Sequence, residues 1–273
     1  MTVYPLIIHL GPLSVTGYGL MMMVAFLMAG YAMQKELQRR GENEEYAADI
    51  VVAAVIGGIL GAKLWYVGLT QDLGALMSRG GLVWYGGFLG GVAAVLFNGW
   101  RKRVPTTYTM DLGSPALALG YALGRVGCFL VQDDYGIPTS LPWGMKFPNG
   151  LPPTTAAELT KFHVSVPANT PPWEVLAVHP TQLYEVALML FAFWILWRLR
   201  VHQHAQGWLF GVYLVLAGTE RFLVEFLRAK DDRFLGPFTV AQATSVACVI
   251  AGALIMKKLN RREAPVPAAG AHA

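Results

Sequence analysis

The stretch ADIVVAAVIGGILGAKLWYVGL, residues 48–69, has only two charged side chains, Asp49 and Lys63. A helix of about 20 apolar residues is long enough to cross the roughly 30 Å hydrocarbon core of a bilayer. Six more windows have the same apolar character, near residues 16–34, 82–100, 111–131, 180–199, 207–226 and 238–256. The sequence therefore predicts an all-α integral membrane protein, a bundle of seven transmembrane helices.

The composition also indicates a lipid environment. Hydrophobic residues make up 55% of the 273-residue chain and charged residues 14%, about half the charged share usual in soluble domains. The mean hydropathy of +0.44 excludes an intrinsically disordered chain. The basic residues form short scattered clusters rather than a stripe interleaved with aromatic residues, so no nucleic acid is expected as a partner.

Lysine and arginine are unequally distributed between alternate loops, which predicts the orientation of the chain. The richer side carries Lys35, Arg39, Arg40, Arg101, Lys102, Arg103, Arg198, Arg200, Lys257, Lys258, Arg261 and Arg262, and the poorer side Arg79, Lys146, Lys161, Arg228, Lys230 and Arg233. Because cytoplasmic loops carry the excess of positive charge, we expect the N-terminus outside and the C-terminus in the cytoplasm.

The longest connection between predicted spans is residues 132–178, which are rich in proline and polar residues. With the predicted orientation, this segment forms a small extracytoplasmic loop subdomain. We expect one transmembrane domain over residues 1–263 and a flexible tail over 264–273.

Three cations, Lys63, Arg125 and Arg221, fall within or at the edge of predicted spans. Each costs on the order of 2.5–3.5 kcal/mol near the bilayer centre and needs a partner, a route to the interface or a function. Arg125 precedes the polar run 132–134, which suggests an internal ion pair with a nearby carboxylate.

A second structural interpretation applies to Arg221, Glu225 and Arg228. Their i, i+4, i+7 spacing would place them on one helix face as an ion ladder at the end of the sixth span.

A functional interpretation follows from how many polar groups occur at the predicted extracytoplasmic ends of spans four, five and six. These groups are Arg125, Asp133, His179, Gln182, Glu185, Arg221, Glu225 and Arg228. One shared cavity would gather them, and two arginines in it would form a clamp for a phosphate, because guanidinium donates paired hydrogen bonds. A lipid phosphate is the anion present at that depth.

Glycines cluster in the second and third predicted spans. They are Gly57, Gly58 and Gly61, then Gly86, Gly87, Gly90 and Gly91. Their small-residue spacing predicts close packing of these two helices. Tyr85, next to the second cluster, and Tyr18, at the start of the first span, could each be an interfacial anchor or part of a site.

Several motifs occur in an order and spacing that carry a family resemblance. They are TGYGLM (16–21), WYGGFLGG (84–91), GRVGCFLVQDDYG (124–136), LPWGMKFP (141–148), HPTQLYE (179–185) and RFLVEFLR (221–228). Together they resemble the prolipoprotein diacylglyceryl transferases of the bacterial inner membrane. The resemblance implies transfer of the diacylglyceryl group of phosphatidylglycerol to the lipobox cysteine of a preprolipoprotein, at the outer membrane face.

The resemblance also implies roles for particular residues. It implies catalytic roles for Arg125, Arg221, Tyr85 and Tyr18. It implies that phosphatidylglycerol is bound by Arg125, Arg221, Cys128, Asp133, Gly136, Gln182, Glu185, Glu225 and Arg228. The implied partners are phosphatidylglycerol, lipobox peptides and membrane lipids, with no metal and no organic cofactor.

This chain departs from the family pattern at three positions. Cys128 stands where an asparagine is usual, Tyr85 where many members have a histidine, and Lys63 where an arginine is common. Unperturbed tyrosine titrates near pH 10, so Tyr85 would need help to accept a proton. The departures leave open a non-catalytic lipid- or lipoprotein-binding paralogue, and an enzyme in which Cys128 is itself the nucleophile. Composition alone also admits a transporter, although the spans have no obvious inverted repeat.

Overall fold

The protein is described by a computed structural model, which describes residues 1–11, 13–77, 82–230, 233–235 and 238–259. The long helices in these ranges are α1 (Gly17–Arg40), α2 (Glu45–Thr70), α3 (Trp84–Arg101), α4 (Thr106–Val131), α6 (Thr181–Leu199), α7 (Trp208–Glu225) and α8 (Val240–Lys258). Shorter elements are the 3-10 helix η1 (Leu73–Met77), α5 (Ala156–Lys161) and two antiparallel hairpins, β1 (Ile7–Leu10) with β2 (Leu13–Thr16) and β3 (Arg233–Leu235) with β4 (Phe238–Thr239). The helical prediction holds for every long element, and the two small hairpins were not predicted.

Each of the seven apolar windows corresponds to one long helix, but the end of the first helix was predicted wrongly. The first predicted window ends at residue 34, whereas α1 continues to Arg40. Residues 35–40 have strong helix propensity, and Glu36 forms ion pairs with Arg39 and Arg40 at 2.6 and 2.7 Å within the helix. Hydropathy therefore marks where the apolar segment stops and not where the helix stops.

The helices identify a multi-pass membrane protein. Five of them, α1, α2, α4, α6 and α8, have the length and hydropathy needed to cross a bilayer. Large apolar side chains are exposed along them, among them Leu27, Ile59 and Leu254. The 18 residues of α7 include three charged side chains, Glu220, Arg221 and Glu225.

The chain divides into two compact units. The first comprises Met1–Ala25 with Leu117–Ala273, and the second comprises Phe26–Ala116. The predicted tail 264–273 lies outside the described residues, as do three cations used to predict orientation, Arg79, Arg261 and Arg262.

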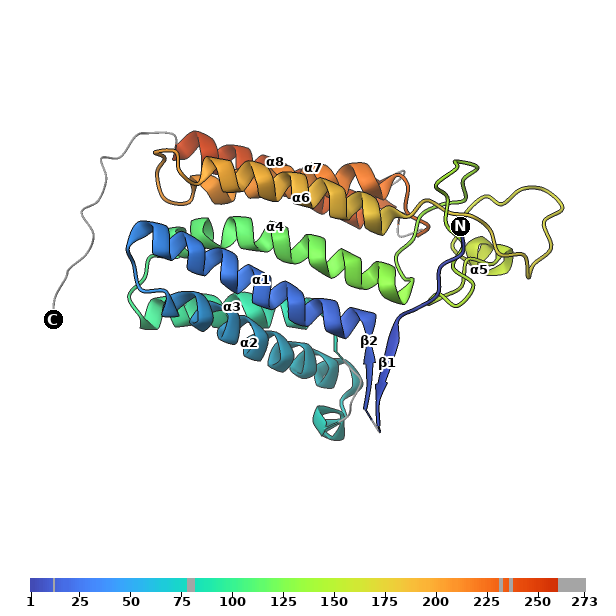
Figure 1. Ribbon diagram of the computed structural model, residues 1–273, viewed down its shortest axis with the longest axis horizontal. Helices are drawn as coiled ribbons and strands as arrows, with labels where there is room; N and C mark the ends of the chain where they lie inside the picture. Colours follow the sequence, from blue (N-terminus) through green and yellow to red (C-terminus); the bar gives the residue numbers. More distant parts are fainter. Residues whose placement is uncertain (12, 78–81, 231–232, 236–237, 260–273) are drawn as a thin grey trace. The chain divides into compact units, whose positions relative to one another are not determined.

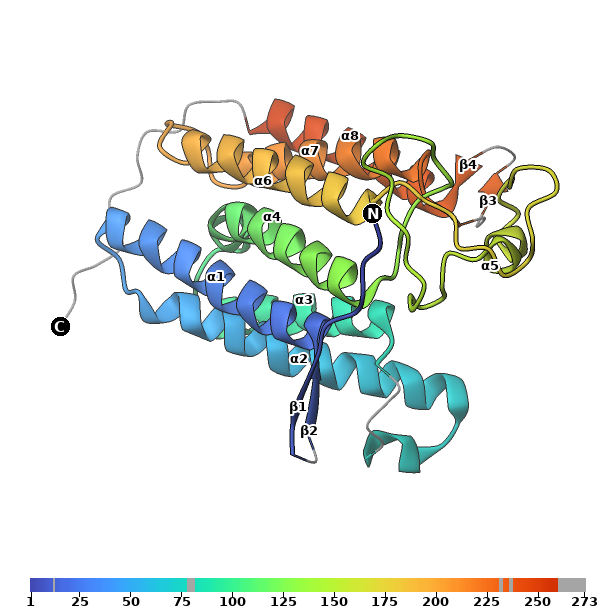
Figure 2. The same cartoon turned by 45° about the vertical axis from the view of Figure 1, so that its right-hand side comes forward.

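In the second unit, α2 and α3 pack backbone to backbone along their glycines, as predicted (Figure 2). A β-carbon added to Gly61 would lie 2.3 Å from the carbonyl oxygen of Gly86. One added to Gly90 would lie 2.3 Å from the carbonyl oxygen of Gly57. Any larger residue at these positions would push the two helices apart.

In the first unit, α6, α7 and α8 run side by side (Figure 1). Their core includes Met189, Leu196 and Leu209, and Ala118 and Ala122 of α4 pack into the same cluster. The small alanines allow α4 to approach the other helices closely.

The loop 132–178 forms a packed layer beyond the N-terminal end of α6 and contains α5 (Figure 2). Its centre is a buried cluster that includes Phe147, Leu159 and Val178. The first residues of the chain run beside it, because the Val3 amide donates to the Lys146 carbonyl at 3.0 Å. This layer holds in place the turn that follows α4.

We expect Gly61→Ala to lower the thermal stability of the detergent-solubilised protein, because the new methyl group would overlap the Gly86 carbonyl. Overpacking of this kind costs roughly 1–3 kcal/mol, so the unfolding midpoint should fall by several degrees. Gly68→Ala is the matched control, since a β-carbon at that position of the same helix meets nothing within 4 Å. Equal unfolding midpoints for the two variants would contradict the close packing of α2 and α3.

Candidate active site

Three helix ends of the first unit meet beside the turn 132–136, namely the C-terminal ends of α4 and α7 and the N-terminal end of α6 (Figure 1). Backbone hydrogen bonds join these segments. The Gly136 amide donates to the His179 carbonyl at 2.9 Å, and the Ile137 amide donates to the Leu227 carbonyl at 2.8 Å. A β-carbon on Gly136 would lie 2.5 Å from that same Leu227 oxygen, so glycine is required for this approach.

Glu185 is the centre of the polar cluster, and its side chain is 0% exposed. Its Oε2 lies 2.9 Å from Nε of Arg125, and its Oε1 lies 3.4 Å from Nη1 of Arg221 and 3.9 Å from Nη1 of Arg228. Tyr121 donates its hydroxyl to Oε1 at 3.2 Å. One buried carboxylate from the first turns of α6 therefore orients three arginines.

Glu225 is the second buried carboxylate of the cluster. Its Oε2 lies 2.6 Å from Nη2 of Arg221 and 3.6 Å from Nε of Arg228. The predicted ion ladder thus exists, but its geometry differs from the prediction, because α7 ends at Glu225 and Arg228 lies beyond it. Arg228 instead pairs with Gly136 in an antiparallel bridge, which turns its side chain toward the end of α4.

Asp134 is the carboxylate partner that was expected for Arg125. Arg125 donates from Nη1 to its Oδ2 at 2.7 Å, and Arg228 donates from Nη2 to its Oδ1. Burial opposes ionisation, but Arg228 and Arg125 outweigh it and lower the pKa of Asp134 to about 2. Asp134 is therefore an anion at neutral pH.

Two side chains at the start of α6 hold the backbone of Asp133 and Asp134 in place. Thr181 donates its hydroxyl to the Asp134 carbonyl at 2.8 Å, and Gln182 donates from Nε2 to the Asp133 carbonyl. His179 lies just before them, with Nδ1 3.2 Å from the Tyr184 hydroxyl. Burial lowers the pKa of His179, which favours the neutral imidazole.

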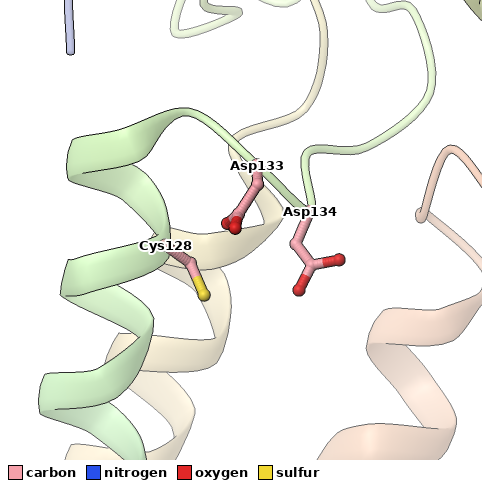
Figure 3. Close-up of side chains that lie close together, drawn as sticks. All are labelled: Cys128, Asp133 and Asp134. Atoms are coloured by element: carbon pink, nitrogen blue, oxygen red, sulfur yellow. The ribbon is translucent and has the colours of Figure 1, made fainter. Parts of the chain in front are cut away.

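Cys128, Asp133 and Asp134 approach one another beside the arginines, with ligand atoms within 4.8 Å of one another (Figure 3). Burial and the neighbouring Asp134 raise the pKa of Asp133. The group has donor atoms suited to a metal ion, but both Asp134 oxygens already accept from guanidinium groups. A metal ion at Asp134 would have to displace both of these charge-assisted hydrogen bonds.

The predicted catalytic tyrosines lie in different units. Tyr18, in the first turn of α1, packs against α4, where a β-carbon on Gly127 would lie 3.2 Å from its Cδ2. Tyr85 belongs to the second unit, at the start of α3, where its ring meets Trp84 edge to face. Lys63 lies on α2 of the same unit.

Three members of the cluster, Asp134, Tyr121 and Glu220, were not among the predicted site residues. Tyr121 precedes Arg125 by one helical turn and accepts from its Nη2 at 3.3 Å, a relation that i, i+4 spacing on a helix could have indicated. Glu220 is buried next to Arg221, and its Oε1 has no hydrogen-bond partner within the described part of the chain. Its position within a predicted span, directly before Arg221, was the signal in the sequence.

Comparisons with known proteins identify the family of the chain. The family model "Prolipoprotein diacylglyceryl transferase" matches residues 5–257. Relatives named phosphatidylglycerol–prolipoprotein diacylglyceryl transferase include one from Clostridium tetani, 31% identical over 92% of this chain and 96% of the relative. Others come from Paraburkholderia phymatum, at 32% identity over 94% of this chain and 93% of the relative, and Burkholderia mallei, at 34% over 94% and 95%. The resemblance noted in the motifs is confirmed, and the chain belongs to the prolipoprotein diacylglyceryl transferase family.

Proposed function

We propose that the protein transfers the diacylglyceryl group of phosphatidylglycerol to the lipobox cysteine of a preprolipoprotein. The cysteine sulfur attacks the terminal glycerol carbon of the lipid and forms a thioether. The bond between that carbon and the phosphate oxygen breaks, glycerol phosphate leaves with the electron pair, and the thiol proton passes to a base. The observation that carries the proposal is the convergence of Arg125, Arg221 and Arg228 on one buried carboxylate in a member of this family.

The arginines supply what this reaction needs most, stabilisation of a departing phosphate. Negative charge grows on the phosphate oxygen as the carbon–oxygen bond breaks, and fixed guanidinium donors lower the energy of that state. Glu185 and Glu225 hold Arg221 from two sides, so its orientation is set before substrate arrives. Arg125 is held in the same way by Glu185 and Tyr121.

Further residues of the first unit belong to the proposed site. Cys128, Asp133, Gly136 and Gln182 shape the phosphatidylglycerol site beside the arginines, together with Glu185, Glu225 and Arg228. Tyr18 acts at the reacting centre, and its packing against Gly127 supports this role. The family resemblance gives Tyr85 a catalytic role as well.

The same proposal includes an orientation. All seven long helices cross the bacterial inner membrane, with the N-terminus outside, the C-terminus in the cytoplasm and the active site at the outer face. The helix found at each apolar window and the excess of positive charge on one set of loops support it. Lipobox peptides would then reach the site from the outer side, next to the loop 132–178.

Arg125→Ala and Arg221→Ala are each expected to reduce the transfer rate about 100-fold or more, because each removes a fixed hydrogen-bond donor from the negative charge that develops on the phosphate. The assay supplies detergent-purified protein with phosphatidylglycerol and a lipobox peptide and follows the mass gain of one diacylglyceryl group. Arg221→Lys keeps a cation for the buried carboxylates, so it separates loss of the guanidinium fork from misfolding. Arg101→Ala, at the exposed end of α3, is the matched control. Full activity in the folded Arg221→Ala variant would remove this residue from the mechanism.

Cys128→Ser is expected to keep most of the transfer activity, because the substrate supplies the nucleophilic sulfur. Cys128 is buried, with Sγ 3.7 Å from Nη1 of Arg125, and serine preserves its size and a polar atom. Cys248→Ser, which changes the cysteine of α8, serves as the control in the same peptide assay. Complete loss in a folded Cys128→Ser variant, with the control intact, would make Cys128 the nucleophile.

A further inference from the structure

Asp134 joins two guanidinium groups through its two oxygens. Arg125 donates to Oδ2 and Arg228 donates to Oδ1. A phosphodiester has two non-bridging oxygens that accept hydrogen bonds from arginines in the same way. The Asp134 carboxylate therefore accepts the same two guanidinium hydrogen bonds that the phosphate group of a lipid could accept.

Exposure distinguishes Asp134 from the other acids of the cluster. Its side chain is 38% exposed, whereas those of Glu185 and Glu225 are 0% and 1% exposed. The two arginines are largely buried, at 16% for Arg125 and 5% for Arg228. Among the described carboxylates that contact these arginines, Asp134 is thus the one that an incoming anion can replace.

The backbone at Asp134 is held independently of its side chain. Thr181 donates to its carbonyl oxygen, and the residue lies three positions after the end of α4. Rotation of the side chain into solvent would release both arginines without moving a helix. Glu185 and Glu225 would keep the guanidinium groups in place during this exchange.

We propose that the Asp134 carboxylate occupies the phosphate position before substrate binds, and that the lipid phosphate displaces it from Arg125 and Arg228. This inference rests on the proposed function and adds a residue that sets affinity and selectivity. A diacylglycerol without phosphate cannot compete with Asp134 for the arginines. After transfer, the returning carboxylate competes with glycerol phosphate and promotes its release.

Asp134→Asn tests this directly, because the amide keeps the size of the side chain and removes its charge. We expect the KM for phosphatidylglycerol, and the inhibition constant of added glycerol phosphate, to fall about tenfold, with kcat no higher than in the unchanged protein. If Asp134 only held the arginines in place, both constants would rise instead. An unchanged or raised KM in the folded variant would overturn the inference.

Two further variants control the measurement. Glu158→Gln makes the same chemical change at a partly exposed carboxylate of α5, whose partner is Lys161, and should leave both constants unchanged. Asp134→Glu keeps the competing charge, so its constants should stay closer to those of the unchanged protein than to those of Asp134→Asn. A tenfold fall in the constants of Asp134→Glu would contradict competition by charge.

Binding of glycerol phosphate, measured by calorimetry on the detergent-purified protein, separates this inference from the proposed function. Tighter binding by Asp134→Asn supports displacement even if the unchanged protein transfers nothing, an outcome that would refute only the proposed function. Equal or weaker binding by Asp134→Asn, with transfer intact in the unchanged protein, would refute only the displacement.

Discussion

The buried carboxylate of Glu185 is the interaction on which the site depends. An ion without water around it is stable only when charges and hydrogen bonds compensate it, and here Arg125, Arg221, Arg228 and Tyr121 do so together. Because these groups come from α4, α7 and the segment after α7, their pairing with Glu185 of α6 joins four parts of the first unit at one point. Removing any one partner leaves charge uncompensated where water is scarce.

Much of the fold could be predicted because helices in lipid are long and apolar. All seven windows form helices, and the glycines of α2 and α3 meet as their spacing indicated. The errors have physical causes. Residues 35–40 are mostly polar, so the apolar window stops before them. The helix itself continues to Arg40, because Glu36 forms ion pairs with Arg39 and Arg40 along α1. The hairpin of β1 and β2 is too short for a strong alternating pattern to emerge.

The site could be predicted only as a list of residues, because contacts between distant segments depend on where each helix ends. Arg228 was expected on the helix that carries Arg221, yet α7 stops at Glu225, and Arg228 meets Gly136 instead. The same change of direction brings Asp134 between Arg125 and Arg228, and no spacing rule could have selected Asp134 over Asp133. Glu220 lies outside the i, i+4, i+7 series of Arg221, Glu225 and Arg228, so that spacing did not select it.

The hydrogen bond between Val3 and Lys146 has a consequence for biogenesis. The two residues are 143 positions apart, and at about 5–20 residues per second the ribosome needs roughly ten seconds or more to make the intervening chain. During that interval Val3 has no partner, because Lys146 has not yet been made. The layer around Phe147 can close only after α4 has been inserted and residues as late as Val178 have emerged. The candidate active site is therefore among the last parts of the first unit to assemble, well after the earliest residues of the chain have been made.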